Sequence, residues 1–225
     1  MVRIIDIKQS VFADNDADAA RLRQQLNARG VFLVNLMSSP GAGKTSVLRR
    51  TIDALKDEFR IGVMEADIDS AVDAEALARL QVDVIQLHTG GMCHLDADMT
   101  RQGLRELGVF DGEKSPYDLV FLENVGNLVC PAEFDTGACR NVMILSVPEG
   151  DDKPLKYPLM FQVSQAVLVN KIDALSLFDF DVERARGRVA GRNGDAAFFT
   201  LSARTGEGFA PWLDWLRSQI KAERG

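Results

Sequence analysis

Histidine, cysteine and long apolar runs are scarce in this sequence of 225 residues, and each scarcity excludes a class of protein. Three cysteines without a secretory signal peptide argue against a disulfide framework, so metal binding is the more credible use of these thiols. No apolar run approaches the roughly 20 residues that a membrane-spanning helix needs. Basic residues are outnumbered 26 to 33, and the net charge of −7 disfavours sequence-independent nucleic-acid binding. We therefore expect a cytoplasmic protein without nucleic-acid or membrane partners.

Apolar segments with the length of strands alternate along the chain with helix-like segments. This alternation predicts an α/β fold of three layers, a mostly parallel sheet with helices on both faces. We expect an N-terminal extension over residues 1–30 and a main domain over residues 31–225. The extension is predicted to hold a short extended piece at 2–5 and a helix from Asp14 to Arg29, with Gly30 as its stop. The expected strands are 31–36, 61–64, 82–87, 117–122, 142–147, 166–169 and 197–201.

The strongest motif is Ser38-Ser39-Pro40-Gly41-Ala42-Gly43-Lys44-Thr45, which lies between a predicted strand and a predicted helix. It fits the phosphate-binding pattern G-x-x-x-x-G-K-[ST], except that serine replaces the first glycine. Gly41 and Gly43 allow backbone N–H groups to turn toward phosphate oxygens, and the next helix directs its positive dipole end at the same anion. Lys44 would reach the β- and γ-phosphates, and the Thr45 hydroxyl would ligate Mg²⁺. The flanking elements disfavour the alternative, a glycine-rich turn with a solvated lysine.

Carboxylates follow two predicted strands, where a magnesium site or a water-orienting group belongs beside a phosphate loop. Asp67 and Asp73 come after the second strand. Glu123 ends the fourth strand, and Gly126 stands three residues on, as is typical of the γ-phosphate-sensing loop of P-loop proteins. The alternatives are an acidic helix start after the second strand and a plain turn after the fourth. The predicted magnesium ligands, direct or through water, are Thr45, Asp67, Asp73 and Glu123.

Two loops after the last two strands are typical of guanine recognition. Asn170-Lys171-Ile172-Asp173 matches the pattern N-K-x-D, whose aspartate can accept from two donor groups of guanine. Adenine lacks that pair of donors and would leave a buried carboxylate unpaired. Ser202-Ala203-Arg204-Thr205-Gly206-Glu207-Gly208 resembles the loop whose backbone closes over guanine in GTPases. We therefore predict GTP as the ligand. The predicted nucleotide-binding residues are Pro40, Gly41, Ala42, Gly43, Lys44, Thr45, Ser46, Asn170, Lys171, Asp173, Ser202 and Ala203.

A second group of candidate ligands lies in two other loops that follow strands. Cys93 and His94 share a loop with two glycines, and Cys130 lies in the loop after the fourth strand. These side chains can converge near the γ-phosphate, and thiolates with an imidazole suit Zn²⁺ and Ni²⁺. One chain offers at most three ligands whereas a structural zinc site uses four, so we expect a metal shared between two chains of a dimer. The alternatives are small buried cysteines and a histidine capping the next helix; Cys139 and His88 are interpreted as structural.

Together these motifs resemble those of the HypB family, the GTPases of nickel incorporation into hydrogenase. The resemblance runs from about residue 20 to the end. It implies a P-loop GTPase domain over residues 31–225, slow GTP hydrolysis, a GTP-dependent homodimer and nickel delivery to a nickel-iron hydrogenase. Its marks are the motif Ser38 to Thr45, Cys93-His94-Leu95-Asp96-Ala97, Glu123-Asn124-Val125-Gly126-Asn127-Leu128-Val129-Cys130-Pro131, Asp151-Asp152-Lys153-Pro154-Leu155-Lys156-Tyr157-Pro158 and Asn170-Lys171-Ile172-Asp173.

The resemblance also maps the family's metal ligands, for Ni²⁺ or Zn²⁺, onto Cys93, His94 and Cys130. It implies a HypA-like maturation partner and, indirectly, a hydrogenase large-subunit precursor. The chain departs from some family members because it has no histidine-rich tract and no cysteine before Cys93, so nickel storage is not expected. Lys44 and Asp67 are the catalytic candidates, Asp67 as the water-orienting residue because no glutamine follows Gly126.

Three other functions compete with this interpretation. A urease-accessory type of GTPase is disfavoured by the Cys93-His94 pair together with Cys130, since a single Cys-x-His element would be expected there. A P-loop phosphotransferase is disfavoured by the guanine motif at 170–173. A nucleotide-switched scaffold without a metal role would bind no metal in a titration of the purified chain, whereas our interpretation predicts binding.

Overall fold

The computed structural model describes residues 7–67 and 80–224, with side chains described over 12–66 and 80–223. In these residues seven strands form one sheet in the order β3-β2-β4-β1-β5-β6-β7, and every neighbouring pair is parallel. The predicted α/β class and parallel sheet are thereby confirmed. The strands are β1 (Phe32–Ser38), β2 (Ile61–Asp67), β3 (Asp83–His88), β4 (Leu119–Glu123), β5 (Arg140–Ser146), β6 (Ala166–Asn170) and β7 (Ala197–Thr200).

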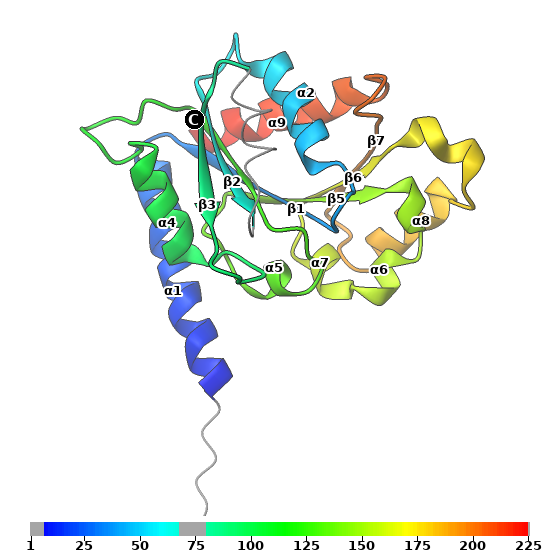
Figure 1. Cartoon of the computed structure of the whole chain (residues 1–225), viewed down its shortest axis with the longest axis horizontal. Coiled ribbons are helices and arrows are strands. Elements are labelled where there is room, and N and C mark those ends of the chain that lie inside the picture. The colour runs from blue at the N-terminus through cyan, green and yellow to red at the C-terminus, as the bar shows by residue number, and fades with distance from the viewer. Residues whose placement is uncertain (1–6, 68–79, 225) are drawn as a thin grey trace, which may run out of the picture.

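Helices cover both faces of this sheet, as the three-layer prediction requires. Figure 1 shows α2 and α9 on one face and α1, α4 and α8 on the other. No helix in the described parts of the chain is long and apolar enough to cross a membrane. The helices are α1 (Ile7–Ala28), α2 (Lys44–Leu55), α4 (Ala97–Glu106), α5 (Cys130–Glu133), α6 (Lys153–Lys156), α7 (Pro158–Gln162), α8 (Val182–Ala190) and α9 (Phe209–Arg224), with 3₁₀ turns η1 (Val147–Glu149) and η2 (Ile172–Leu177).

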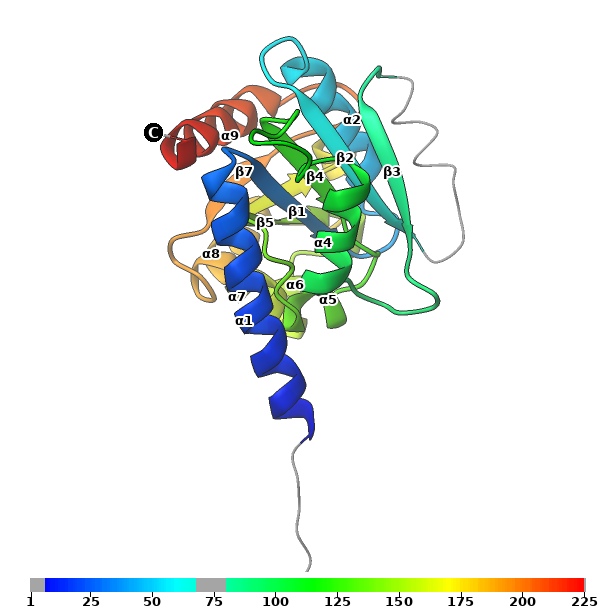
Figure 2. The ribbon, with the colours of Figure 1, turned by 90° about the vertical axis from the view of Figure 1, so that its left-hand side faces the viewer.

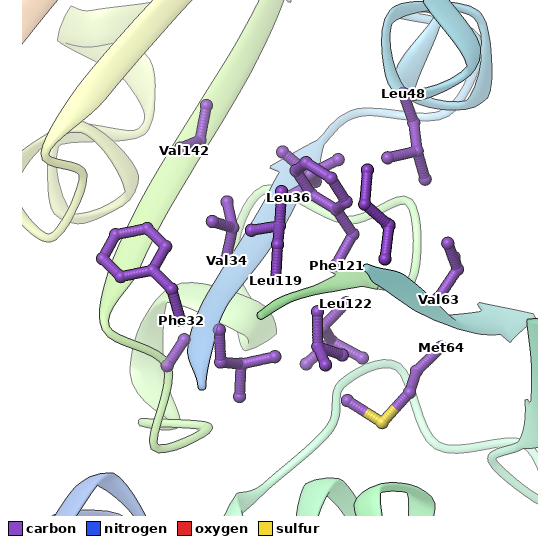
Figure 3. Close-up of a cluster of buried hydrophobic side chains, with 14 of the residues drawn as sticks. Phe32, Val34, Leu36, Leu48, Val63, Met64, Leu119, Phe121, Leu122 and Val142 are labelled. Carbon is purple, nitrogen blue, oxygen red and sulfur yellow. The ribbon is translucent and has the colours of Figure 1, made fainter. Parts of the chain in front are cut away.

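The core lies against the central strands, which are buried along their whole length. Every residue of β1 and β4 is buried, because a parallel sheet with helices on both faces leaves neither face to water. Figure 3 shows side chains of β1 and β4, among them Leu36 and Phe121, gathered with Val63 of β2 and Leu48 of α2. Each such side chain contributes roughly 1.5–3 kcal/mol on burial. The carboxyl ends of these strands are therefore held on a rigid base.

The chain order of the strands defines where a ligand belongs. From β1 the chain crosses to β2 on one side of the sheet, whereas β5 pairs with β1 on the other side. In open α/β sheets, ligands bind at the carboxyl ends of the strands where the order reverses in this way. The loop after β1 occupies that position.

The N-terminal helix is longer than predicted. It begins at Ile7 instead of Asp14, because no glycine or proline interrupts the segment before the acidic residues. It ends at Ala28, and Gly30 follows with a φ of +69°, as the predicted stop requires. The face formed by Ala19, Leu22 and Leu26 is buried, whereas Figures 1 and 2 show the first turns projecting beyond the sheet.

Candidate functional site

The loop between β1 and α2 turns back on itself at two glycines. Gly41 and Gly43 have φ values of +74° and +97°, in the left-handed region that favours glycine. Lys44 is the first residue of α2, so the helix begins directly at the loop. Its Nζ lies 3.2 Å from the Oγ of Ser38, the buried residue that replaces the first glycine of the motif. The Ser38 hydroxyl also donates to the Ser39 carbonyl at 2.6 Å, which places the serine between the loop and the lysine.

A hydroxyl and a carboxylate from different elements meet beside this loop. The Oγ1 of Thr45 donates to the Oε1 of Glu123 at 2.7 Å, and Glu123 is buried at the end of β4. β2 pairs with β4 so that Glu65 stands opposite Glu123, and the backbone of Asp67 ends β2 two residues further on. Oxygen ligands of this kind are those that Mg²⁺ prefers, so the residues fit the ion. Asp73 lies outside the described residues.

The loops 170–173 and 202–208, which the sequence predicts to surround the base, are called the first and the second base loop. The first base loop is tied to the phosphate loop by two side chains. Asn170 donates through Nδ2 to the Ala42 carbonyl at 2.9 Å and accepts through Oδ1 from the Ala203 N–H at 3.0 Å. Lys171, with a φ of +66°, donates through Nζ to the Gly41 carbonyl at 2.7 Å. The phosphate loop and both base loops are thus one hydrogen-bonded unit.

The carboxylate of Asp173 faces the second base loop. Its Oδ1 accepts from the Ser202 hydroxyl at 2.6 Å, and its Oδ2 lies 3.4 Å from the Nε of the exposed Arg204. A cavity of about 630 Å³ opens between these loops and α2. It is lined in part by Gly43, Ser46, Arg50, Asn170, Asp173 and Ala203.

Two further residues join these loops and were missed from the sequence. Arg50 of α2 donates to the carbonyls of Ala203 and Arg204, and a lone arginine on a helix offers no pattern by which this could be predicted. Glu149 accepts from the Ser39 hydroxyl and, at 2.8 Å each, from the backbone N–H and hydroxyl of Ser146. The spacing of Ser146 and Glu149 is that of a capping box, which could have indicated the second contact.

The structure brings Cys93, His94 and Cys130 together. The Sγ atoms of Cys93 and Cys130 lie 2.8 Å apart, and the Nδ1 of His94 lies 3.9 Å from the Cys93 sulfur. Gly90 and Gly91 have φ values of +62° and +91°, which supply the predicted kink of the loop. Among the described residues, no group of three or more His, Cys, Asp and Glu side chains is arranged to hold a metal ion within one chain. A metal at this edge would therefore need ligands from outside the described residues or a rearrangement of the loops.

Burial and neighbouring groups shift the pKa values of two of these candidate ligands, His94 and Cys130. The His94 ring stacks on Phe134 with centroids 3.8 Å apart. Burial lowers the pKa of His94, and this effect outweighs the opposite effect of the negative charges of Asp96 and Glu133. The hydrogen bond with Cys93, followed by burial, raises the pKa of the Cys130 thiol. The imidazole is therefore neutral at neutral pH, which is the form that binds metals. Cys139 is buried with its sulfur 3.8 Å from the Asn27 amide oxygen, in line with a structural role.

Known proteins share both the sequence and the fold. The family model of the CobW/HypB/UreG nucleotide-binding domain matches residues 31–200. The hydrogenase maturation factor HypB of Azotobacter vinelandii is 44% identical over 96% of this chain and 70% of that protein. Crystal structures of HypB from Archaeoglobus fulgidus and of HypB from Helicobacter pylori in complex with nickel each have a TM-score of 0.84 and 36% identity. They cover 92% and 94% of this chain, and 99% and 97% of their own chains are matched.

The parallel sheet, the phosphate loop at its switch point and the family match define a P-loop nucleotide-binding protein of the CobW/HypB/UreG class. Within that class, the chain belongs to the HypB family of hydrogenase maturation factors. The resemblance stated from the motifs is thereby confirmed.

Proposed function

We propose that the chain is a GTP-hydrolysing metallochaperone that binds nickel or zinc and assists nickel insertion into a nickel-iron hydrogenase. The loop that follows β4 carries this proposal. It starts at Glu123, which accepts from Thr45, and ends at Cys130, whose sulfur contacts that of Cys93. Glu123, on the nucleotide side, and Cys130, a proposed metal ligand, are thus only seven residues apart on one segment.

The same loop packs on the phosphate loop. Gly126 is so close to Pro40 that an added Cβ would lie 3.2 Å from three of its atoms. A shift of the phosphate loop at Pro40 would therefore press on the loop that leads to Cys130. This contact supports coupling between the nucleotide state and the metal ligands.

GTP is the proposed nucleotide because of the groups around the cavity. Asp173 would accept from the two donors of guanine, while Asn170 and Lys171 hold the base loop against the phosphate loop. Adenine would leave the carboxylate without those donors, so we expect GTP to be favoured over ATP.

Lys44 and Thr45 are the proposed residues for hydrolysis. Lys44 would stabilise charge on the β- and γ-phosphates, and Thr45 would hold Mg²⁺ with the help of Glu123 and Asp67. Bound Mg²⁺ supplies neutralisation of phosphate charge. Asn127 follows Gly126 where glutamine would orient water in other GTPases, so Asp67 is the proposed water-orienting residue and turnover without a partner should be slow.

Cys93, His94 and Cys130 are the proposed ligands of the metal cargo. Nickel is favoured because the similar Helicobacter pylori structure is a complex with nickel, and zinc suits the same donors. Because the described residues of one chain do not form a complete ligand set, we propose that two copies pool their ligands across this edge. The exposed apolar residues Met92 and Val129, each next to a cysteine, fit such a GTP-dependent homodimer.

The family membership supports two further partners. We propose that the chain works in the cytoplasm with a HypA-like maturation partner and acts, indirectly, on the hydrogenase large-subunit precursor. The projecting first turns of α1 would be accessible to such a partner (Figure 2).

Equilibrium dialysis with nickel and with GDP tests the proposal. Cys93→Ala and His94→Ala should lose nickel binding and keep GDP binding, whereas Cys139→Ala, the matched control, should keep both. Lys44→Ala should abolish phosphate release from GTP. Unchanged nickel stoichiometry in the ligand variants, or normal turnover in Lys44→Ala, would reject the corresponding half of the proposal.

A further inference from the structure

Arg50 connects the helix that follows the phosphate loop to the loop that surrounds the base. Its Nε donates to the Ala203 carbonyl at 3.0 Å, and its Nη2 donates to the Arg204 carbonyl at 3.2 Å. One guanidinium therefore binds two successive carbonyls of the segment 202–208. Because the planar group carries its donors in a fixed fork, it constrains both peptide planes at once.

The guanidinium itself is held in place from two other directions. Its carbon lies 5.6 Å from the centroid of the Phe209 ring, at the start of α9. Gly206 lies against it, since a Cβ at that position would be 2.5 Å from Nη1. Gly206 also has a φ of +90°, so the turn requires glycine and leaves room for Arg50. The position of Arg50 is thus defined by packing as well as by hydrogen bonds.

These contacts set the direction of a backbone donor. The peptide that joins Ala203 to Arg204 is trans, so its carbonyl and its N–H point in opposite directions. Arg50 binds the carbonyl, and Asn170 accepts from the preceding N–H, that of Ala203. The Arg204 N–H is therefore fixed in a loop that lines the cavity.

A fixed N–H in the loop that lines the cavity would affect which base the cavity binds. Guanine has an oxygen acceptor at position 6, where adenine has an amino donor. A preoriented N–H donor attracts the oxygen of guanine and repels the amino group of adenine. If the loop were free to turn, its N–H would no longer discriminate between the two bases.

We propose that Arg50 is a positioning residue for guanine recognition, acting through the loop 202–208 and not by touching the phosphates. The inference rests on the proposed GTP binding. Arg50 also lines the cavity, so direct contact with a phosphate is the competing role. Arg186 of α8 is exposed, lies outside the lining of this cavity and has the same charge, which makes it the matched control.

The test is calorimetric titration of the full chain and its variants with magnesium GDP, magnesium ADP and magnesium pyrophosphate. Arg50→Met should weaken GDP binding about tenfold, as expected for two lost hydrogen bonds, and change pyrophosphate binding less than twofold. Arg50→Lys can bind one carbonyl and should recover about half of the loss on a logarithmic scale. Arg186→Met should leave both affinities within twofold.

Each outcome decides between the roles. An equal loss for GDP and pyrophosphate assigns Arg50 to the phosphates and overturns the proposal, as does unchanged GDP affinity in Arg50→Met. If Arg50→Met does not fold, Arg50→Lys carries the same comparison with about a threefold loss for GDP. A wild-type chain that binds ADP as well as GDP would instead refute the proposed GTP function, which keeps the two failures distinguishable.

Discussion

A methyl group added at Gly43 should weaken nucleotide binding through its contact with Asn170. Gly43 has a φ of +97°, and its Cβ would lie 2.6 Å from the Nδ2 of Asn170. Asn170 is buried, and its amide group is bonded to Ala42 on one side and to Ala203 on the other. The amide cannot move aside without losing these bonds, so Gly43→Ala should separate the phosphate loop from the base loops.

The cost of Gly43→Ala has two parts that different measurements detect. The left-handed backbone costs about 1–2 kcal/mol for alanine, in free and bound protein alike, and lowers stability. Displacement of Asn170 removes two hydrogen bonds worth about 1 kcal/mol each and disturbs the base loops. Since about 1.4 kcal/mol is a tenfold change, GDP affinity should fall roughly 30-fold. Gly41→Ala is the matched control, because Gly41 has a φ of +74° but no atom within 4 Å of an added Cβ.

Calorimetric titration with GDP and thermal unfolding of both variants separate these parts. Both variants should lose stability, Gly43→Ala by about 2 kcal/mol more because it also loses the two Asn170 hydrogen bonds. Only Gly43→Ala should lose GDP affinity by more than a few fold. An equal affinity loss in the two variants would show that backbone strain alone, and not the contact with Asn170, weakens GDP binding.

Three further predictions concern other residues. Thr45→Val should lower magnesium-dependent phosphate release from GTP at least about tenfold and leave magnesium-free GDP binding nearly unchanged, a result that equal losses would contradict. Cys130→Ala should reduce the nickel stoichiometry in equilibrium dialysis, whereas Cys139→Ala should not. Burial and a hydrogen bond to Asp83 raise the pKa of Tyr117 to about 12. Protonated Tyr117 therefore contributes its full stabilisation of the fold below about pH 10, the pKa of tyrosine in an unfolded chain. This contribution to the free energy of unfolding falls by roughly 2 kcal/mol as the pH rises to 12. Urea unfolding at pH 9 and pH 12 should show the loss, and Tyr117→Phe should remove it.

The loops that follow strands could be predicted because their position depends on chain order alone. Cys93 and Cys130 are 37 residues apart, yet parallel strands bring their loops to one edge of the sheet. The left-handed turns at Gly41 and Gly43 were predictable for a local reason, since glycine is the residue that such φ values favour.

Contacts between distant side chains could not be predicted. Arg50 and Ala203 are 153 residues apart, and no periodicity or motif links them. The start of α1 was placed too late because the acidic residues from Asp14 on suggested a first turn, whereas they lie inside a longer helix. The roles of Asp67 and Asp73 remain predictions from the sequence.

Nickel titration of the purified chain shows whether the nucleotide state controls the proposed metal ligands. The titration follows sulfur-to-nickel charge-transfer absorbance with GDP bound and with a non-hydrolysable GTP analogue bound. We predict saturable binding whose affinity differs between the two nucleotide states. Equal affinity in both states would show that the nucleotide does not control these ligands, and no charge-transfer band in either state would show that the cysteines do not bind nickel.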